Sequence, residues 1–182
     1  MIQNDPDADL LPLIAAGDQA AIRQLVARKL PRLLALGVRM LNDRDEAEDV
    51  AQETFVRVWN NAATCQQERA KFDTWLHRVA LNLCYDRLRA RSHYSDEEVP
   101  DLMDSAPIAE QRLDHQQQND HVAAALALLP TRQREALVLQ FYQALSNTDS
   151  AQLMDVSVEA LESLLARARR NLRQVLLAES AV

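Results

Sequence analysis

Apolar side chains recur at intervals of three and four residues over most of this chain, which is the spacing of one face of an α-helix. The spacing predicts helices over 7–41, with a break near Gly17 and Asp18, and then over about 43–59 and 72–91. Further helices are expected up to Leu129, from about Thr131 to about Gln143 with Thr131 as the cap, and at 146–154 and 157–177. No segment alternates apolar and polar residues with period two, so the pattern predicts an all-α protein.

The helix expected after residue 42 has a clear start and a clear buried face. Asn42 or Asp43 can cap it, and Glu46 follows Asp43 at capping-box spacing. The positions predicted to be buried share the three-and-four spacing: Ala47, Val50, Ala51, Thr54, Phe55, Val58 and Trp59. The polar stretch 60–71 lacks periodicity and is predicted to be a loop. Trp75, just beyond it, fits a core position better than a base-stacking position.

The C-terminal pair of helices has the layout of a helix-turn-helix DNA reader. The first helix of the pair follows Ser146, the turn is Asp155–Val156, and the second helix starts at Ser157. The second helix places leucines on one side and four arginines at 167, 169, 170 and 173. Arginine can hold phosphate or read guanine, although an ordinary amphipathic helix with a basic solvent face gives the same pattern.

The charge of the chain is unevenly distributed. The formal net charge is −7, and residues 92–120 account for all of it, since they carry eight acidic side chains against Arg112. This stretch includes two prolines and little periodicity, which is typical of a linker. We therefore expect two small helical domains, at 1–91 and 113–182, joined by a flexible acidic linker at 92–112.

Other classes of protein find little support in the sequence. No apolar run reaches the length of a membrane span, and the acidic N-terminus does not resemble a signal peptide. Cys65 and Cys84 fit neither a disulfide framework nor a metal site, and the histidines lack ligand spacing. We expect a cytoplasmic protein without metal, cofactor, catalytic residues or membrane insertion. An all-α enzyme has no convergent titratable groups in its favour.

Three stretches resemble the extracytoplasmic-function group of bacterial RNA polymerase sigma factors. Residues 45–59, DEAEDVAQETFVRVW, are similar to the family's helix that grips the polymerase clamp. Residues 72–82, FDTWLHRVALN, resemble the start of the helix that engages the −10 promoter element. The third stretch resembles the family's reader of the −35 element and consists of residues 129–137, 145–147 and 156–169. The match covers nearly the whole chain outside the linker, in the family's order.

The resemblance implies partners and site residues. The partners are core RNA polymerase, promoter DNA and, as is common in this group, an anti-sigma factor. It implies polymerase contacts at Asp49, Gln52, Glu53 and Val56, although these can also form a solvated acidic face. It implies −10 contacts at Gln66, Gln67, Arg69, Lys71, Asn82, Asp86 and Arg87. For the −35 element it implies Glu162, Ser163, Ala166 and Arg167, and the basic side chains Arg132, Arg134 and Arg170 can join them.

Several points remain open at this stage. Glu162 can accept a hydrogen bond from cytosine or repel the DNA backbone. The linker can line a basic polymerase channel, a hypothesis that fails if neutralising its acids leaves initiation intact. Asp155 stands where the family usually has glycine, and Ser150 where it has an apolar residue. A conventional regulator with a ligand-binding or dimerising N-terminal domain is the alternative, and polymerase pull-down separates the two.

Overall fold

The computed structural model describes residues 7, 9–65, 72–95 and 121–179, and the regular structure in these ranges is helical. The named helices are α1 (Leu10–Ala15), α2 (Gln19–Leu41), α3 (Arg44–Cys65), α4 (Phe72–Ser95), α6 (Thr131–Leu137), η1 (Val138–Tyr142), α7 (Asn147–Met154) and α8 (Val158–Glu179). Residues 121–127 form one more helix. The expected all-α fold is confirmed.

Local sequence signals set the boundaries of the first helices. Gly17, with φ +83°, separates α1 from α2, and the Asp18 carboxylate accepts hydrogen bonds from the amides of Ala20 and Ala21 at the start of α2. Asn42 ends α2 in the left-handed conformation. The Asp43 carboxylate then accepts from the amide of Glu46 at 2.9 Å. The predicted break near residue 17 is confirmed, and Asp43 is the capping side chain of α3.

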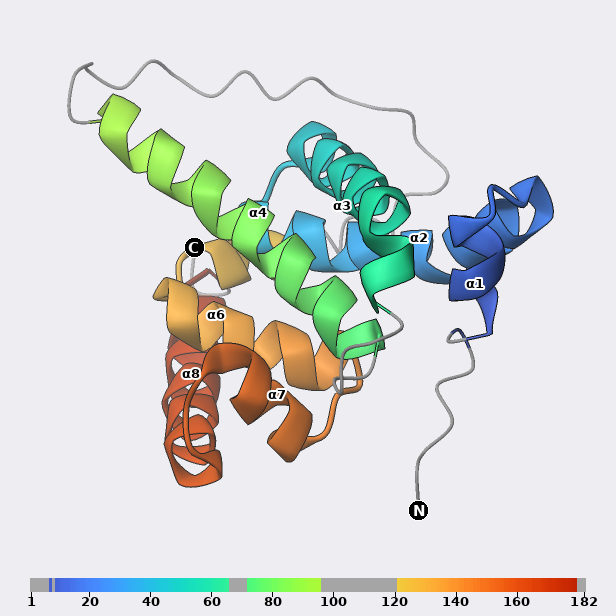
Figure 1. Cartoon of the computed structure of the whole chain (residues 1–182). Helices are drawn as coiled ribbons and strands as arrows, with labels where there is room; N and C mark the ends of the chain where they lie inside the picture. Colours follow the sequence, from blue (N-terminus) through green and yellow to red (C-terminus); the bar gives the residue numbers. More distant parts are fainter. Residues whose placement is uncertain (1–6, 8, 66–71, 96–120, 180–182) are drawn as a thin grey trace, which may run out of the picture.

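Helices α1 to α4 form one packed group (Figure 1). Their core includes Leu25, Leu36, Val50, Val58 and Leu76, all almost fully buried. Helices α2 and α3 approach closely at Gly37, where an added Cβ would lie only 2.8 Å from the Cβ of Ala47. A residue without a side chain is therefore required at this crossing of the two helices.

Two expectations about α3 are wrong. Trp59 is 42% exposed rather than buried. The chain also stays helical through Cys65, where a loop was expected from residue 60. The extension contains neither glycine nor proline, and it buries Ala62 completely in the core. Residues 66–71 lie outside the described residues. Helix α4 continues to Ser95, four residues beyond the expected end at 91.

The second group comprises α6, η1, α7, α8 and the helix at 121–127 (Figure 1). Pro130 precedes α6 and no side chain caps it, so the expected cap at Thr131 is wrong. The helix then widens into one π-type turn, a feature often found at functional positions. Leu161, Leu165 and Ala168 of α8 are buried, which confirms the centre of its predicted apolar face.

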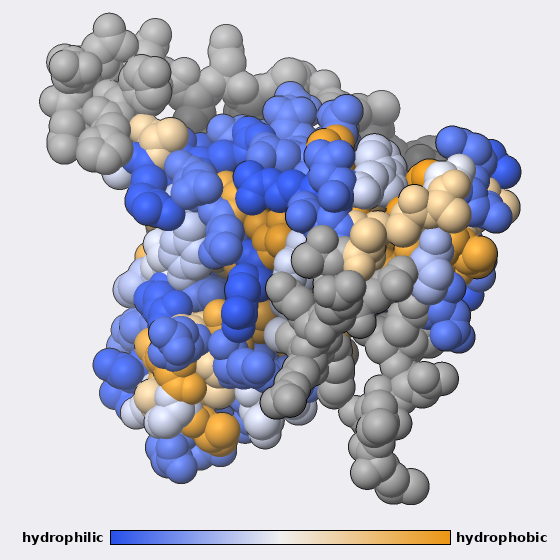
Figure 2. Space-filling view, in the orientation of Figure 1, coloured by the Kyte–Doolittle hydropathy of each residue, from blue (hydrophilic) through white to orange (hydrophobic). Residues whose placement is uncertain are grey.

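Helix α4 lies on the side of the first group that faces the second group (Figure 1). The second group contacts the first through α6 and η1 against α2, and through α7 against α4. The face drawn in Figure 2 is mainly hydrophilic, with separate hydrophobic spots rather than one large apolar patch. No described helix has the length and apolar content needed to cross a membrane. Most of the predicted linker, 96–112, lies outside the described residues.

Candidate nucleic-acid and protein interfaces

Helices α7 and α8 form the expected helix-turn-helix. The Ser146 hydroxyl accepts a hydrogen bond from the amide of Asp149 at 3.1 Å and caps α7. Asp155 ends α7 with φ 54° and ψ 50°, the left-handed conformation usually supplied by glycine. The Ser157 hydroxyl accepts from the amide of Ala160 at 3.2 Å and caps α8. Asp155 thus occupies the strained turn position that was predicted from the sequence.

One exposed face of α8 carries five of the predicted −35 contacts. This face consists of Glu162, Ser163, Ala166, Arg167 and Arg170. The opposite face packs into the core of the second group, so the orientation of α8 is fixed by burial. The exposed face presents an acid, a hydroxyl, a methyl group and two guanidinium groups, a mixture that can combine base contacts with phosphate contacts.

The two basic residues of α6 have very different surroundings. The side chain of Arg132 is 46% exposed and donates to the carbonyl of Met154 at 2.6 Å. Arg134 is buried, and its guanidinium donates to the carbonyls of Met40, Ala127 and Leu129. Burial, followed by the charge of Arg91, lowers the pKa of Arg134. In this arrangement Arg134 joins the two helical groups and does not face solvent.

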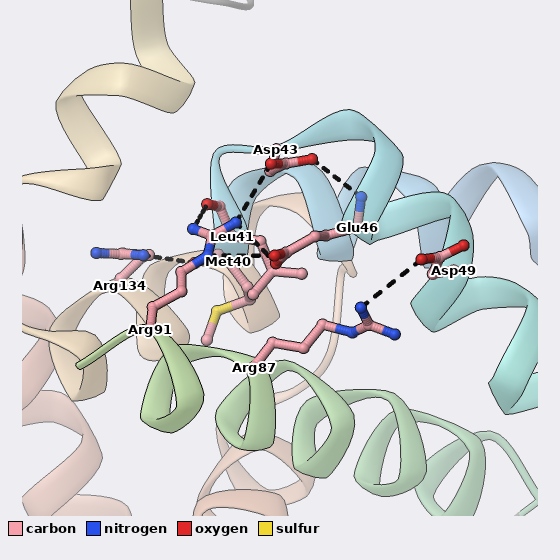
Figure 3. Close-up of polar contacts among 8 residues, drawn as sticks. All are labelled: Met40, Leu41, Asp43, Glu46, Asp49, Arg87, Arg91 and Arg134. Carbon is pink, nitrogen blue, oxygen red and sulfur yellow. Dashed lines mark hydrogen bonds and ion pairs between the residues drawn. The ribbon is translucent and has the colours of Figure 1, made fainter. Parts of the chain in front are cut away.

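Figure 3 shows how Arg134 meets the end of α2 beside a second basic side chain. Arg91 of α4 donates to the carbonyl of Leu41 at 2.8 Å and pairs with Glu46 at 2.7 Å and with Asp43 at 3.4 Å. Two guanidinium groups therefore satisfy carbonyls at the C-terminal end of α2, where the helix dipole favours positive charge.

The predicted −10 contacts on α4 are accessible only in part. Asn82 and Asp86 are exposed, and Asp86 pairs with Arg89 at 2.9 Å. Arg87 is half-buried and lies 3.8 Å from Asp49 of α3. Figure 3 shows the two side chains pointing toward each other. A predicted DNA contact thus faces a predicted polymerase contact. The remaining predicted contacts, Gln66, Gln67, Arg69 and Lys71, lie outside the described residues.

The predicted polymerase contacts form one face of α3. Asp49, Gln52 and Val56 are exposed, and Glu53 pairs with Arg57 one turn away at 2.8 Å. Trp59 lies next to Val56 on this face and stacks on Phe55 at a ring-centroid distance of 6.4 Å. The spacing of three and four residues predicted that Trp59 is buried, and its exposure on this face corrects that prediction. The structure adds a large aromatic side chain to the mixed acidic and apolar surface.

Further polar contacts join the two helical groups. The Tyr85 hydroxyl of α4 donates to the buried carboxylate of Glu135 in α6. Nε2 of His77 lies 3.1 Å from Oε1 of Gln143, and the amide nitrogen of Gln143 donates to the carbonyl of Arg32. Burial raises the pKa of Glu135, and burial together with the Glu135 bond raises the pKa of Tyr85 to about 12. The interface therefore rests on directional bonds as well as apolar contact.

The guanidinium of Arg39 adds a cation–π contact to the same interface. It lies 3.8 Å from the centre of the Tyr142 ring. Arg78 of α4 also donates to the carbonyl of Gln152 in α7 at 3.4 Å. Helix α4 and the helix-turn-helix are therefore in direct contact.

One buried charged cluster had no counterpart in the sequence analysis. Lys29 occupies a core-facing position of α2, between the buried Leu25 and Leu33, and is only 6% exposed. Its ammonium group pairs with Asp7 at 2.6 Å and with Asp73, the second residue of α4. The only sequence signal was a lysine at an apolar position of the helical pattern. No cluster of three possible metal ligands occurs among the described residues.

The chain is similar to two family models and to proteins of known function. Residues 25–94 match Sigma-70 region 2, and residues 120–172 match Sigma-70 region 4. The ECF RNA polymerase sigma factor SigE of Mycolicibacterium smegmatis is 32% identical over 174 residues, which cover 92% of this chain and 67% of SigE. The sigma factor CnrH of Cupriavidus metallidurans is 31% identical over 190 residues, 99% of both chains.

Two solved structures share the arrangement of the chain. CnrH in complex with the cytosolic domain of CnrY matches with a TM-score of 0.72 and 29% identity, covering 94% of this chain and 97% of that one. The sigma factor RpoE of Bartonella quintana, in complex with the anti-sigma factor NepR, matches with a TM-score of 0.69 and 25% identity, covering 85% and 95%.

Proposed function

The chain belongs to the extracytoplasmic-function group of bacterial RNA polymerase sigma factors, and we propose which of its surfaces contact the polymerase and the promoter. A sigma factor is not an enzyme: it binds core polymerase, directs it to promoters and helps to open the −10 region. The proposal assigns polymerase binding to α3, −10 contacts to α4 and −35 contacts to α8. Because core polymerase is a cytoplasmic complex, the site of action is the cytoplasm.

The exposed side of α3 is the proposed polymerase contact. Asp49, Gln52 and Glu53 supply carboxylates and an amide, while Val56 and Trp59 supply apolar area beside them. A large aromatic side chain surrounded by polar groups is typical of the energetically important centre of a protein interface. The acidic groups favour a basic partner surface and speed its association.

The observation that carries the DNA assignment is the orientation of α8 in the helix-turn-helix. Burial of its leucine face leaves the exposed face of five residues, from Glu162 to Arg170, free to enter a major groove. On α4, Asn82 and Asp86 are exposed for the −10 element. Arg87 can contact the −10 element once it separates from Asp49, and the 3.8 Å between the two charged groups is long for an ion pair.

We propose that the described arrangement is a closed form that opens on promoters. The two promoter elements lie about 25 base pairs apart, or about 85 Å along a duplex at roughly 3.4 Å per base pair. Here α4 and α7 touch through Arg78 and Gln152. The same chain cannot hold this contact and occupy both elements, so opening also breaks the bond from Arg134 to Met40, while its bonds to Ala127 and Leu129 lie within the second group.

An anti-sigma protein is the proposed partner of the closed form. A structure similar to this chain is a sigma factor in complex with an anti-sigma factor. A partner that binds both helical groups while they are packed together stabilises the closed form by mass action. The acidic linker is also part of the proposed function, and the place expected for it is a basic channel of the polymerase.

Run-off transcription with core polymerase on a genomic promoter library tests the assignment. We expect initiation from a defined set of promoters and weak DNA binding by the free chain in gel shifts, because the net charge is −7 and the basic clusters are small. Tight, sequence-selective binding by the free chain would instead favour a conventional regulator. Pull-down of core polymerase provides the independent check.

A further inference from the structure

Lys29 is buried in α2 at a position where an apolar side chain would stabilise the fold equally well. Lys29 falls on the stripe of α2 that also buries Leu25, Leu33 and Leu36. Removing an ammonium group from water is costly, and well-packed apolar residues often stabilise a core as much as a buried ion pair does. The advantage of a charged pair is direction, because its hydrogen bonds fix the relative position of two helices.

The two partners of Lys29 lie far apart in the sequence: Asp7 precedes α1, and Asp73 lies in the first turn of α4. Asp7, 2% exposed, pairs with Lys29 at 2.6 Å and with Arg28 at 2.9 Å. Burial alone would raise the pKa of Asp7, but the bonds and charges of Lys29 and Arg28 outweigh it and lower that pKa. Burial alone would lower the pKa of Lys29, and its two carboxylate partners instead raise it. The cluster is therefore charged when the protein is folded.

Asp73 connects this cluster to the first turn of the −10 helix. Its carboxylate pairs with Lys29, and its carbonyl oxygen lies 2.6 Å from Nδ1 of His77 one turn later. The first turn of α4 is thus held by a side-chain bond to α2 and by a ring contact on the same helix. Because α4 is a single helix from Phe72 to Ser95, fixing its first turn also fixes the height and rotation of Asn82 and Asp86.

We propose that Lys29 is a positioning residue for promoter opening, acting through Asp73 on the −10 helix, with Asp7 as its second anion. The proposal rests on the proposed function of α4. It assigns to the N-terminal segment a part in promoter opening, since Asp7 neutralises the lysine whose other bond aligns α4. Misplacing a recognition helix by about 1 Å lowers the rate of a step that depends on its contacts by a large factor.

The test removes the pair from each side. Asp73→Ala deletes the anion on α4 and leaves Lys29 paired with Asp7. Lys29→Met with Asp7→Asn removes both buried charges together, and the remaining Asp73 carboxylate belongs to a side chain that is 30% exposed. With polymerase, both variants should open a promoter labelled with 2-aminopurine in the −10 element about tenfold more slowly than the wild type. Asp73→Glu, which keeps the charge, should recover most of the rate.

The controls separate positioning from loss of folding. Arg44→Ala breaks the exposed pair between Arg44 and Glu48 and should open the promoter at the wild-type rate. The affinity of each variant for core polymerase should change less than twofold at a temperature where circular dichroism shows it folded. Opening at the wild-type rate, or a loss that matches a loss of polymerase affinity, overturns the inference. A wild-type chain that opens no promoter contradicts the proposed function instead.

Discussion

The hydroxyl group of Tyr85 offers a direct test of the closed form. It is the donor of a hydrogen bond that crosses from α4 to Glu135 of α6. Tyr85→Phe removes this oxygen and keeps the ring, so the packing of α4 is unchanged. Tyr85 is absent from the proposed polymerase and DNA surfaces. Any effect of Tyr85→Phe on the separation of the two helical groups therefore reports the strength of the contact between them.

The size of the effect follows from the surroundings of Glu135. A hydrogen bond to a charged group contributes about 1.5–3 kcal/mol. Glu135 is 2% exposed, so water does not replace the lost donor, but Arg132 still contacts the same carboxylate at 3.2 Å. We therefore expect the lower part of the range, about 1.5–2 kcal/mol. The ratio of closed to open molecules should fall about ten- to thirtyfold.

Fluorescence transfer between the two helical groups measures this ratio. Dyes attached to cysteines at Arg23 of α2 and Gln174 of α8, both exposed, report separation of the groups in a Cys65→Ser background. Cys84 is buried, and burial raises the pKa of its thiol to about 12, so it should not be labelled. A urea series, with helix content followed by circular dichroism, locates opening relative to unfolding.

Tyr142→Phe is the matched control. It makes the same chemical change at the same interface, but no hydrogen bond of that hydroxyl occurs within the described part of the chain, and the ring stays beneath Arg39. Tyr85→Phe should lower the urea concentration at which the two helical groups separate, and Tyr142→Phe should not. Equal behaviour of the two variants, or no shift with either, would refute the reasoning.

Four further outcomes are expected. Gly37→Ala places a Cβ 2.8 Å from that of Ala47 and should lower the free energy of unfolding by about 1–3 kcal/mol in thermal denaturation. Ser150→Ala removes a buried hydroxyl without a partner among the described residues and should raise that free energy by about 1 kcal/mol in urea unfolding. Burial raises the pKa of Glu135 above 4.5, so its contribution to stability is fully present below pH 4.5 and lost as pH rises through the folded pKa. Glu135→Gln should flatten that part of the pH profile of the melting temperature. Glu53→Lys should weaken polymerase capture in pull-downs at least about tenfold while leaving helix content unchanged.

Signals within a few residues of one another were enough to predict most of the helices. Asp18 and Asp43 cap the helices that follow them, and Ser146 caps α7. Asp155 occupies a left-handed turn. These features depend on backbone groups two to four residues away, so the sequence contains all the partners involved. The helix-turn-helix and the exposed face of α8 were predictable for the same reason.

Predictions were less successful where local sequence permitted two outcomes. Trp59 lies at the margin of the apolar stripe of α3, and only the position of the neighbouring helices decides that it is exposed. Residues 60–65 are polar, yet they stay helical because Ala62 finds a place in the core. Thr131 has the chemistry of a cap, but α6 begins after Pro130 without one.

By itself the sequence determined the all-α class of the fold and its two helical regions, since these follow from periodicity and local chemistry. The surfaces proposed to contact a polymerase and a promoter came from the resemblance to a family. Only the tertiary structure decided that Arg134 is buried against Met40, that Tyr85 meets Glu135 and that Lys29 joins Asp7 to Asp73. These partners lie 22 to 94 residues apart. Contacts at such separations depend on how whole helices pack, and no spacing along the chain encodes them.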